Sequence, residues 1–323
     1  MRELRRPERV IAPSLRRALP ALRVALVLVP VAWLARRVDA SLVVAHLGAL
    51  PAPALGASLF WSALSVYSFT LRWRLLLRAW GATPPSTTAA LDLVVRSTFW
   101  NLLPGGLIGD VARSDAVRHT VGGLGNALAA LWFERVGGLA GIFLVALGAN
   151  ALAPPTPAWF TRATLLGCLG SLALLALSLA ATRSAAFARR LAALPLLGPR
   201  LGAITPPSRP RDLARALLLS LATQTTSTLA LAGIVHALAP ASDLRAVTAL
   251  SPATGLFTFV PVTPGAIGQR ELVFSMVYGL AGVRADVAVA ASVTSFALGL
   301  LFPLLGGALT LWHHARSASR HEG

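Results

Sequence analysis

Ionisable residues stand at three places inside or beside long apolar stretches of the chain. These are Asp110 with Arg113, Glu134 with Arg135, and Arg270 with Glu271. An ionisable side chain at membrane depth costs about 2.5–3.5 kcal/mol on insertion scales, so such residues are candidates for function by default. Three acids and three arginines form a cluster that is neutral before any ligand arrives, so its charge does not indicate the sign of a substrate. Structural ion pairing between broken helices is the alternative interpretation.

Two of these places follow a Pro-Gly turn inside apolar sequence, one in Ser86–Gly109 and one in Ala249–Val283. Proline removes a backbone donor and glycine permits angles that a helix does not use. At membrane depth, unwound backbone is tolerated only when it is buried in protein or lines a wet cavity. We therefore predict a substrate-binding or translocation site at Asn101, Pro104, Gly105, Gly106, Gly109, Asp110, Arg113, Glu134, Arg135, Pro264, Gly265, Gly268, Arg270 and Glu271.

Other kinds of chemistry have little support in the sequence. All 29 basic residues are arginine, so a phosphate-binding loop with its lysine is excluded. The six histidines show no metal-ligand spacing, and the lone Cys168 permits no intramolecular disulfide. We predict no catalytic residues, no metal and no cofactor.

The composition indicates the elements that must position these residues. Of 323 residues, 55% are hydrophobic and 13% charged, and the mean hydropathy is +0.69. A soluble domain carries about a quarter charged residues, whereas apolar blocks of about 20 residues match the bilayer core. We predict an all-α polytopic integral membrane protein with six spanning helices and two re-entrant Pro-Gly hairpins, eight hydrophobic segments in all. The predicted spans are Leu19–Ala35, Ala54–Leu71, Ala127–Leu152, Ala163–Ala181, Leu217–Leu238 and Ala285–Trp312.

The two broken stretches resemble each other. Thr98-Phe99 lies six residues before Pro104, and Thr258-Phe259 lies six before Pro264, an offset of 160 residues. Three crossings per half make such copies inverted, and paired broken segments in inverted halves indicate a transporter's substrate site. We predict a basic cytoplasmic tail at 1–18, a single membrane domain at 19–312 with halves at roughly 19–153 and 163–312, and a cytoplasmic tail at 313–323.

Arginines are distributed unequally between the two predicted faces. The face that holds both termini has 21, including Arg72, Arg74 and Arg78, and the other face has five. By the positive-inside rule both termini are cytoplasmic, in a multi-pass protein of the bacterial inner membrane. The net charge of +17 therefore indicates membrane lipids as partners, and we expect no nucleic acid.

Two weaker patterns lie on the predicted spans. Ser220, Gln224 and Thr228 recur every four residues, a spacing that suits hydrogen bonds between helices or the wall of a pathway. Four tryptophans stand near predicted span ends, where an interfacial aromatic belt would place them: Trp61, Trp73, Trp80 and Trp159.

Four blocks of sequence together resemble one family. They are Arg72-Trp73-Arg-Leu-Leu-Leu, Asn101-Leu-Leu-Pro-Gly-Gly-Leu-Ile-Gly-Asp110, Phe133-Glu-Arg-Val-Gly-Gly-Leu139, and Pro264-Gly-Ala-Ile-Gly-Gln-Arg-Glu271. In this order they resemble the lysylphosphatidylglycerol synthase transmembrane, or flippase-like, family, the membrane domain of multiple-peptide-resistance proteins. Gln269 departs from the small or apolar residue expected there. The resemblance covers nearly the whole chain and implies movement of an aminoacylated phospholipid between leaflets, with relatives in hopanoid and glycolipid pathways.

We therefore predict a lipid flippase that moves a polar, aminoacylated or glycosylated lipid across the membrane. Bifunctional relatives add a C-terminal aminoacyltransferase, and this chain reaches Gly323 without one, so we expect no enzyme activity. Two alternatives stay open. One is a membrane lipid-modifying enzyme with Asp110 or Glu271 as general base. The other is a non-catalytic partner of a separate lipid-synthesising enzyme, docked through residues 183–215.

Overall fold

The computed structural model describes residues 39–102, 107–152, 156–193, 204–258, 266 and 268–319. These residues form helices and connecting loops, without a strand among them. Five of the helices are long and apolar enough to cross a membrane, and each contains a predicted span, which confirms the all-α membrane class. They are α3 (Ala52–Ala79), α6 (Leu124–Leu152), α7 (Ala158–Thr182), α10 (Pro210–Leu238) and α13 (Ala285–Ser319). The predicted tail 1–18 and span Leu19–Ala35 lie outside the described residues.

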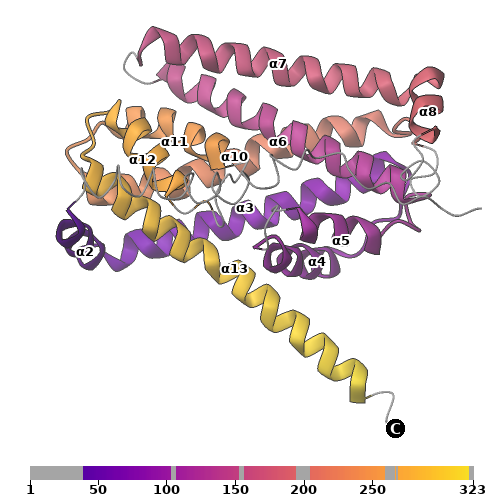
Figure 1. Cartoon of the computed structure of the whole chain (residues 1–323), viewed down its shortest axis with the longest axis horizontal. Helices are drawn as coiled ribbons and strands as arrows, with labels where there is room; N and C mark the ends of the chain where they lie inside the picture. The colour runs from indigo at the N-terminus through magenta and orange to yellow at the C-terminus, as the bar shows by residue number, and fades with distance from the viewer. Residues whose placement is uncertain are drawn as a thin grey trace, which may run out of the picture.

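Shorter helices connect and flank these five (Figure 1). They are α2 (Ala40–Gly48), α4 (Thr87–Trp100), α5 (Ile108–Ala116), α8 (Ala185–Ala192), α11 (Leu244–Thr258) and α12 (Gln269–Gly279). Local sequence determines several of their ends. The Ser86 hydroxyl accepts a hydrogen bond from the Ala89 amide and caps α4, and the Asp39 carboxylate accepts one from the Ser41 amide at the start of α2.

The first broken stretch forms a helical hairpin. Helices α4 and α5 pack against each other, so the chain reverses direction between them. A side chain at Gly109 would place its Cβ 1.9 Å from the Ser97 carbonyl oxygen, so only glycine permits this approach. The Asn101 carboxamide oxygen accepts hydrogen bonds from the Gly109 and Asp110 amides, at 2.8 and 3.3 Å, and caps the returning helix. The predicted turn residues Pro104, Gly105 and Gly106 lie outside the described residues.

The second broken stretch repeats this arrangement with α11 and α12, which also pack against each other. Gly268 precedes α12 with φ of 78°, a conformation that favours glycine. The Glu271 carboxylate accepts a hydrogen bond from the Gly268 amide at 2.8 Å and so caps its own helix. Pro264 and Gly265 lie outside the residues that the structure describes.

The two halves of the chain have the same order of helices. Long, short, short and long helices follow one another as α3–α4–α5–α6 and again as α10–α11–α12–α13. The long closing helix of each half packs on the first short helix of the other, α6 on α11 and α13 on α4. This exchange indicates an approximate twofold relation between the halves.

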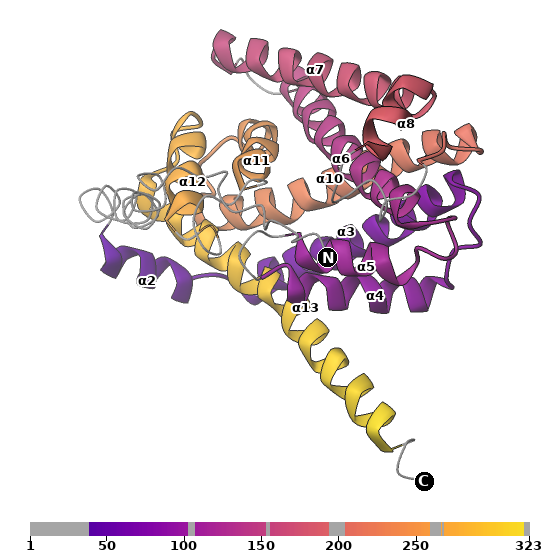
Figure 2. The same cartoon turned by 45° about the vertical axis from the view of Figure 1, so that its right-hand side comes forward.

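The central pair, α3 and α10, shows whether the two halves run in the same or in opposite directions. Ser65 contacts Ser227, and the carbonyl of Ala79 accepts a hydrogen bond from the Arg209 amide. Residue numbers therefore rise along α3 while they fall along α10, so the pair is antiparallel. Equivalent spanning helices that run in opposite directions are the mark of an inverted repeat. Both views show α3 and α10 in the middle of the bundle (Figures 1 and 2).

Buried apolar side chains form two clusters, the first centred on α3 and α6 and the second on α11, α12 and the start of α13. The first includes Trp73, Leu76 and Phe133, and the second includes Val247, Phe274 and Tyr278. Trp73 and Trp80 are 2% and 6% exposed, so their prediction as interfacial residues is wrong. The reason is that α3 continues past the predicted end at Leu71 and packs against α6.

Helix α13 continues to Ser319, whereas the sequence predicted a span to Trp312 followed by a tail. Neither proline nor glycine follows Trp312 before Ser319, so nothing local stops the helix. Its C-terminal half projects away from the other labelled helices (Figures 1 and 2). Where it crosses α4, a Cβ at Gly306 would lie 2.2 Å from the Val95 carbonyl oxygen, so glycine permits the crossing.

Candidate functional site

Four of the predicted charges form one network between α5 and α6. The Arg113 guanidinium binds Asp110 at 3.1 Å and Glu134 at 2.9 Å, and Arg135 binds the other oxygen of Asp110. Adjacent helical residues point about 100° apart, which explains why neighbouring Glu134 and Arg135 have different partners. The side chains of Arg113 and Glu134 are each 1% exposed, whereas Arg135 is 30% exposed.

Aromatic rings cover the centre of this network. The guanidinium carbon of Arg113 lies 4.7 Å from the ring centre of Trp73 and 5.1 Å from that of Phe69. Such cation–π contacts stabilise a desolvated arginine by about 2 kcal/mol. Both rings come from α3, so this helix completes the site that the hairpin and α6 begin.

Arg72 is a further member of the site, and sequence reasoning placed it wrongly on the cytoplasmic face. Its side chain is buried inside the bundle, where it donates a hydrogen bond to the Ser220 hydroxyl at 3.2 Å and lies over Phe69. Because α3 continues past Leu71, Arg72 lies within the helix and among its buried residues rather than in a loop. The sequence did mark Arg72, because it begins one of the four blocks that resemble the family. With Arg72 included, three arginines meet two carboxylates, so this site is cationic rather than neutral.

A cavity of about 350 Å³ opens beside the network, walled by α3, α4, α5, α6 and α10. Polar residues from each of these helices line it, including Arg72, Asn101, Asp110, Glu134, Arg135 and Gln224. Among the described residues, Glu134 Oε2 and Arg72 Nε are buried and have no hydrogen-bond partner. An unsatisfied buried polar atom costs about 1–3 kcal/mol. Arg72 and Glu134 also line the cavity, so a ligand there would satisfy both side chains by accepting from one and donating to the other, whereas the unpaired Nε and Nη1 of Arg113 belong to a residue outside its lining.

The sequence left two roles open for the polar residues of α10: hydrogen bonds between helices, or lining a pathway. Ser220 accepts the hydrogen bond of Arg72, so it joins two helices. Gln224 lines the cavity. Thr228 is buried on the same helix.

The remaining predicted charges form a second group on α12 and α13. Arg270 binds Glu271 and donates to the Ser292 hydroxyl at 2.8 Å, while its guanidinium carbon lies 4.2 Å from the ring centre of Phe296. The sequence predicted a single cluster of six charges, but the ion pairs among the described residues divide them into two groups. The cause is that α5 packs on α6 whereas α12 packs on α13.

A second cavity, of about 330 Å³, adjoins Arg270. It is walled by α3, α10, α11, α12 and α13, so each cavity belongs to one half of the repeat and both share the central pair. Ser65, Val66 and Ser227 line both cavities. The inverted repeat thus provides two polar cavities that meet at the crossing of α3 and α10.

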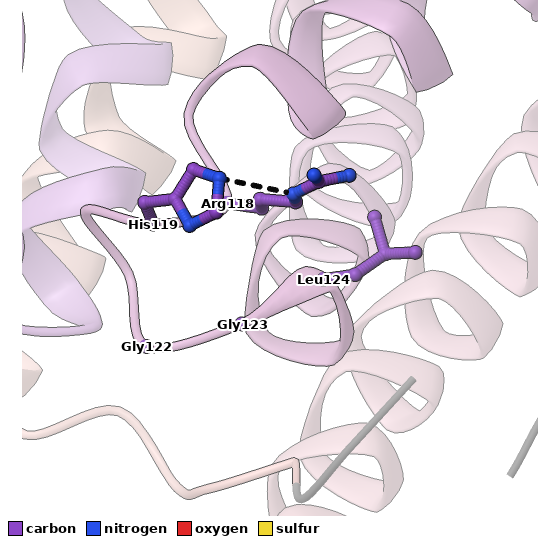
Figure 3. Close-up of a pocket in the computed structure, with 5 residues that line it drawn as sticks. All are labelled: Arg118, His119, Gly122, Gly123 and Leu124. Atoms are coloured by element: carbon purple, nitrogen blue, oxygen red, sulfur yellow. Dashed lines mark hydrogen bonds between the residues drawn. The ribbon is translucent and has the colours of Figure 1, made fainter. Parts of the chain in front are cut away.

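Two other features of the described chain do not compete with these cavities. A hollow of about 580 Å³ lies at the loop before α6, lined by Arg118, His119 and Gly122 among others (Figure 3). Arg118 is exposed there and binds Asp115, so an acidic partner already balances its charge. Asp92 and Arg96 pair locally at 2.7 Å, as their spacing of four predicted. Within the described ranges, no group of metal-ligating side chains comes together.

Comparison with known proteins identifies the family of the chain. No curated protein matches it. The family model described as the lysylphosphatidylglycerol synthase TM region matches residues 21–307, which include both broken stretches and both cavities. The chain therefore belongs to the family of the lysylphosphatidylglycerol synthase TM region.

Proposed function

We propose that this protein is a flippase that moves a polar lipid between the leaflets of the bacterial inner membrane, with both termini cytoplasmic. Membership in a family of lipid-synthase membrane regions supports a lipid-related role. The observation that carries the proposal is the cavity beside Arg72 and Glu134, because it places two buried charged side chains, each with an unpaired polar atom, inside a bundle of helices long and apolar enough to span a membrane.

The chemistry of the first cavity suits a phospholipid headgroup. Arg72 and Arg135 line the cavity and would donate charge-assisted hydrogen bonds to a phosphate. Glu134 Oε2 would accept a hydrogen bond from a hydroxyl or amine on the same headgroup. Arg113 does not line the cavity; it holds the two carboxylates in place from behind. The acyl chains would stay in lipid while the headgroup crosses through protein.

The inverted halves supply a route to both leaflets. Rocking of one half against the other around a fixed site is the usual movement of transporters built this way. With α3 and α10 as the shared wall, such a movement would open first one cavity and then the other. This chain has no phosphate-binding loop lysine, so we expect passive or ion-coupled movement rather than a nucleotide-driven pump.

Reconstitution of the purified protein into liposomes tests the proposal. A fluorescent phospholipid is quenched from outside, and the rate at which the inner pool becomes accessible is compared with that of empty liposomes. We expect the wild-type protein to accelerate this rate, Arg135→Gln to lower it by about tenfold or more, and Arg118→Gln, which changes an exposed arginine outside the two cavities, to leave it unchanged. Absence of transport together with a new lipid product by mass spectrometry would favour a lipid-modifying enzyme instead.

A further inference from the structure

Two hydroxyl groups that contact each other line both cavities. The hydroxyl oxygens of Ser65 on α3 and Ser227 on α10 lie 2.7 Å apart, and both residues line both cavities. Ser65 is also within hydrogen-bond distance of the Thr223 carbonyl oxygen, at 3.2 Å. A headgroup that moves from one cavity to the other along this shared wall passes these two hydroxyls and would exchange hydrogen bonds with them. Groups that can do so are hydroxyls and phosphate oxygens.

The second cavity differs from the first in its charges. Arg270 is its charged wall residue, and hydroxyls of Ser58, Ser62 and Ser295 also line it, but no carboxylate stands among its described lining residues. Glu271 lies behind Arg270 with both oxygens occupied. One accepts from Arg270 and Ser292, and the other accepts from the Gly268 amide. A cationic ligand in this cavity would therefore have hydroxyls as partners and no free carboxylate.

These walls discriminate between kinds of headgroup. A phosphate meets arginines in both cavities: Arg72 and Arg135 in the first and Arg270 in the second. A hydroxyl meets Glu134 in the first and serines in the second. Among the described lining residues, an ammonium meets a carboxylate in the first cavity and none in the second. A buried charge without a paired partner is strongly unfavourable, so an amine-bearing headgroup would be held in the first cavity and would be slow to enter the second.

We infer that the substrate is an anionic phospholipid whose headgroup carries free hydroxyls and no amine, and that this headgroup passes from the first cavity to the second where Ser65 and Ser227 meet. The inference rests on the proposed lipid transport and specifies its substrate. On this inference, the chain prefers an anionic lipid to an aminoacylated, cationic one. The second cavity is the part of the protein that makes this selection.

The test compares three lipids in liposomes that contain the purified full chain. Each carries the same fluorescent acyl chain, and the headgroups are phosphatidylglycerol, phosphatidylethanolamine and lysylphosphatidylglycerol. We expect phosphatidylglycerol to cross at least about tenfold faster than either amine-bearing lipid, the ratio that an unmet charged hydrogen bond sets. Equal rates, or faster movement of an amine-bearing lipid, overturn the inference and leave the proposed transport standing. Movement of no lipid overturns both.

A substitution in the second cavity tests whether that cavity determines the lipid selectivity. Ser62→Asp places a carboxylate in that cavity, and Ser62→Asn is the matched control of the same size without the charge. We expect Ser62→Asp to raise the rate for lysylphosphatidylglycerol relative to phosphatidylglycerol by about tenfold, and Ser62→Asn to leave the ratio as it is. If Ser62→Asp does not fold, Ser295→Asp against Ser295→Asn adds the charge from the facing helix. An unchanged ratio in a folded acidic variant contradicts the assignment.

Discussion

At the scale of single residues, the buried charges have separable roles. Arg113 lies between Asp110 and Glu134 and is covered by two aromatic rings, so it is a structural centre. Arg135 shares Asp110 but reaches the cavity. The sequence predicted the charges themselves, because ionisable residues in apolar sequence are conspicuous. It did not predict their partners or the inward position of Arg72, because those depend on which helices meet.

This division predicts different outcomes for two arginine substitutions. Arg113→Met leaves Glu134 buried without its partner and should destabilise the protein by about 3–5 kcal/mol. Arg135→Gln removes a partly exposed side chain, so it should cost less stability and still lower the transport rate by about tenfold or more. Thermal unfolding in detergent and the liposome assay together measure both effects. If both variants lose stability equally, the whole network is structural.

At the scale of helices, the hairpins were easier to predict than the ends of the long helices. The Pro-Gly turns in apolar sequence indicated a break after α4, which ends at Trp100, and the short helices on either side of each turn pack against each other. Hydropathy placed the end of the second span at Leu71, but α3 continues to Ala79 because Trp73, Leu76 and Leu77 are buried against other helices. Hydropathy reports contact with lipid, whereas the continuation of a helix depends on packing within the protein.

The tight α4–α5 hairpin predicts a strong effect of one added methyl group. Gly109→Ala places a Cβ against the Ser97 carbonyl oxygen, which is backbone and has no rotamer to escape. We expect a loss of about 1–3 kcal/mol or more and a lowered melting temperature. Gly170→Ala is the control, because Gly170 is an exposed helical glycine with open space around it. Equal melting temperatures for the two variants would show that the hairpin is looser than described.

At the scale of the whole molecule, the repeat was predictable and its packing was not. The matching offset of 160 residues is visible in the sequence, and the structure places α3–α6 and α10–α13 in the same order. Helices of one half pack against helices of the other, and the expected single charge cluster is divided between two cavities. Both features result from contacts between segments that are distant in the sequence. No local pattern encodes those contacts.

The antiparallel central pair predicts where introduced cysteines can be labelled. In a Cys168→Ala background, Thr83→Cys after α3 and Ser208→Cys before α10 should react with an impermeant reagent from the same side, because those helix ends adjoin. Ala241→Cys after α10 should react from the opposite side. By the positive-inside rule we expect the first pair to be labelled from the cytoplasmic side. Labelling of positions 83 and 208 from different sides would contradict the inverted arrangement.

The most direct test of the central claim is a mass-spectrometric inventory of the lipids that remain bound to the purified protein. If the cavity between α3, α6 and α10 holds a headgroup, wild-type protein should retain a phospholipid enriched over its share in the membrane, with a phosphate and free hydroxyls in its headgroup. Arg135→Gln should lose that enrichment, and Arg118→Gln should keep it. An identical lipid profile in all three proteins, equal to that of the surrounding membrane, would contradict the account.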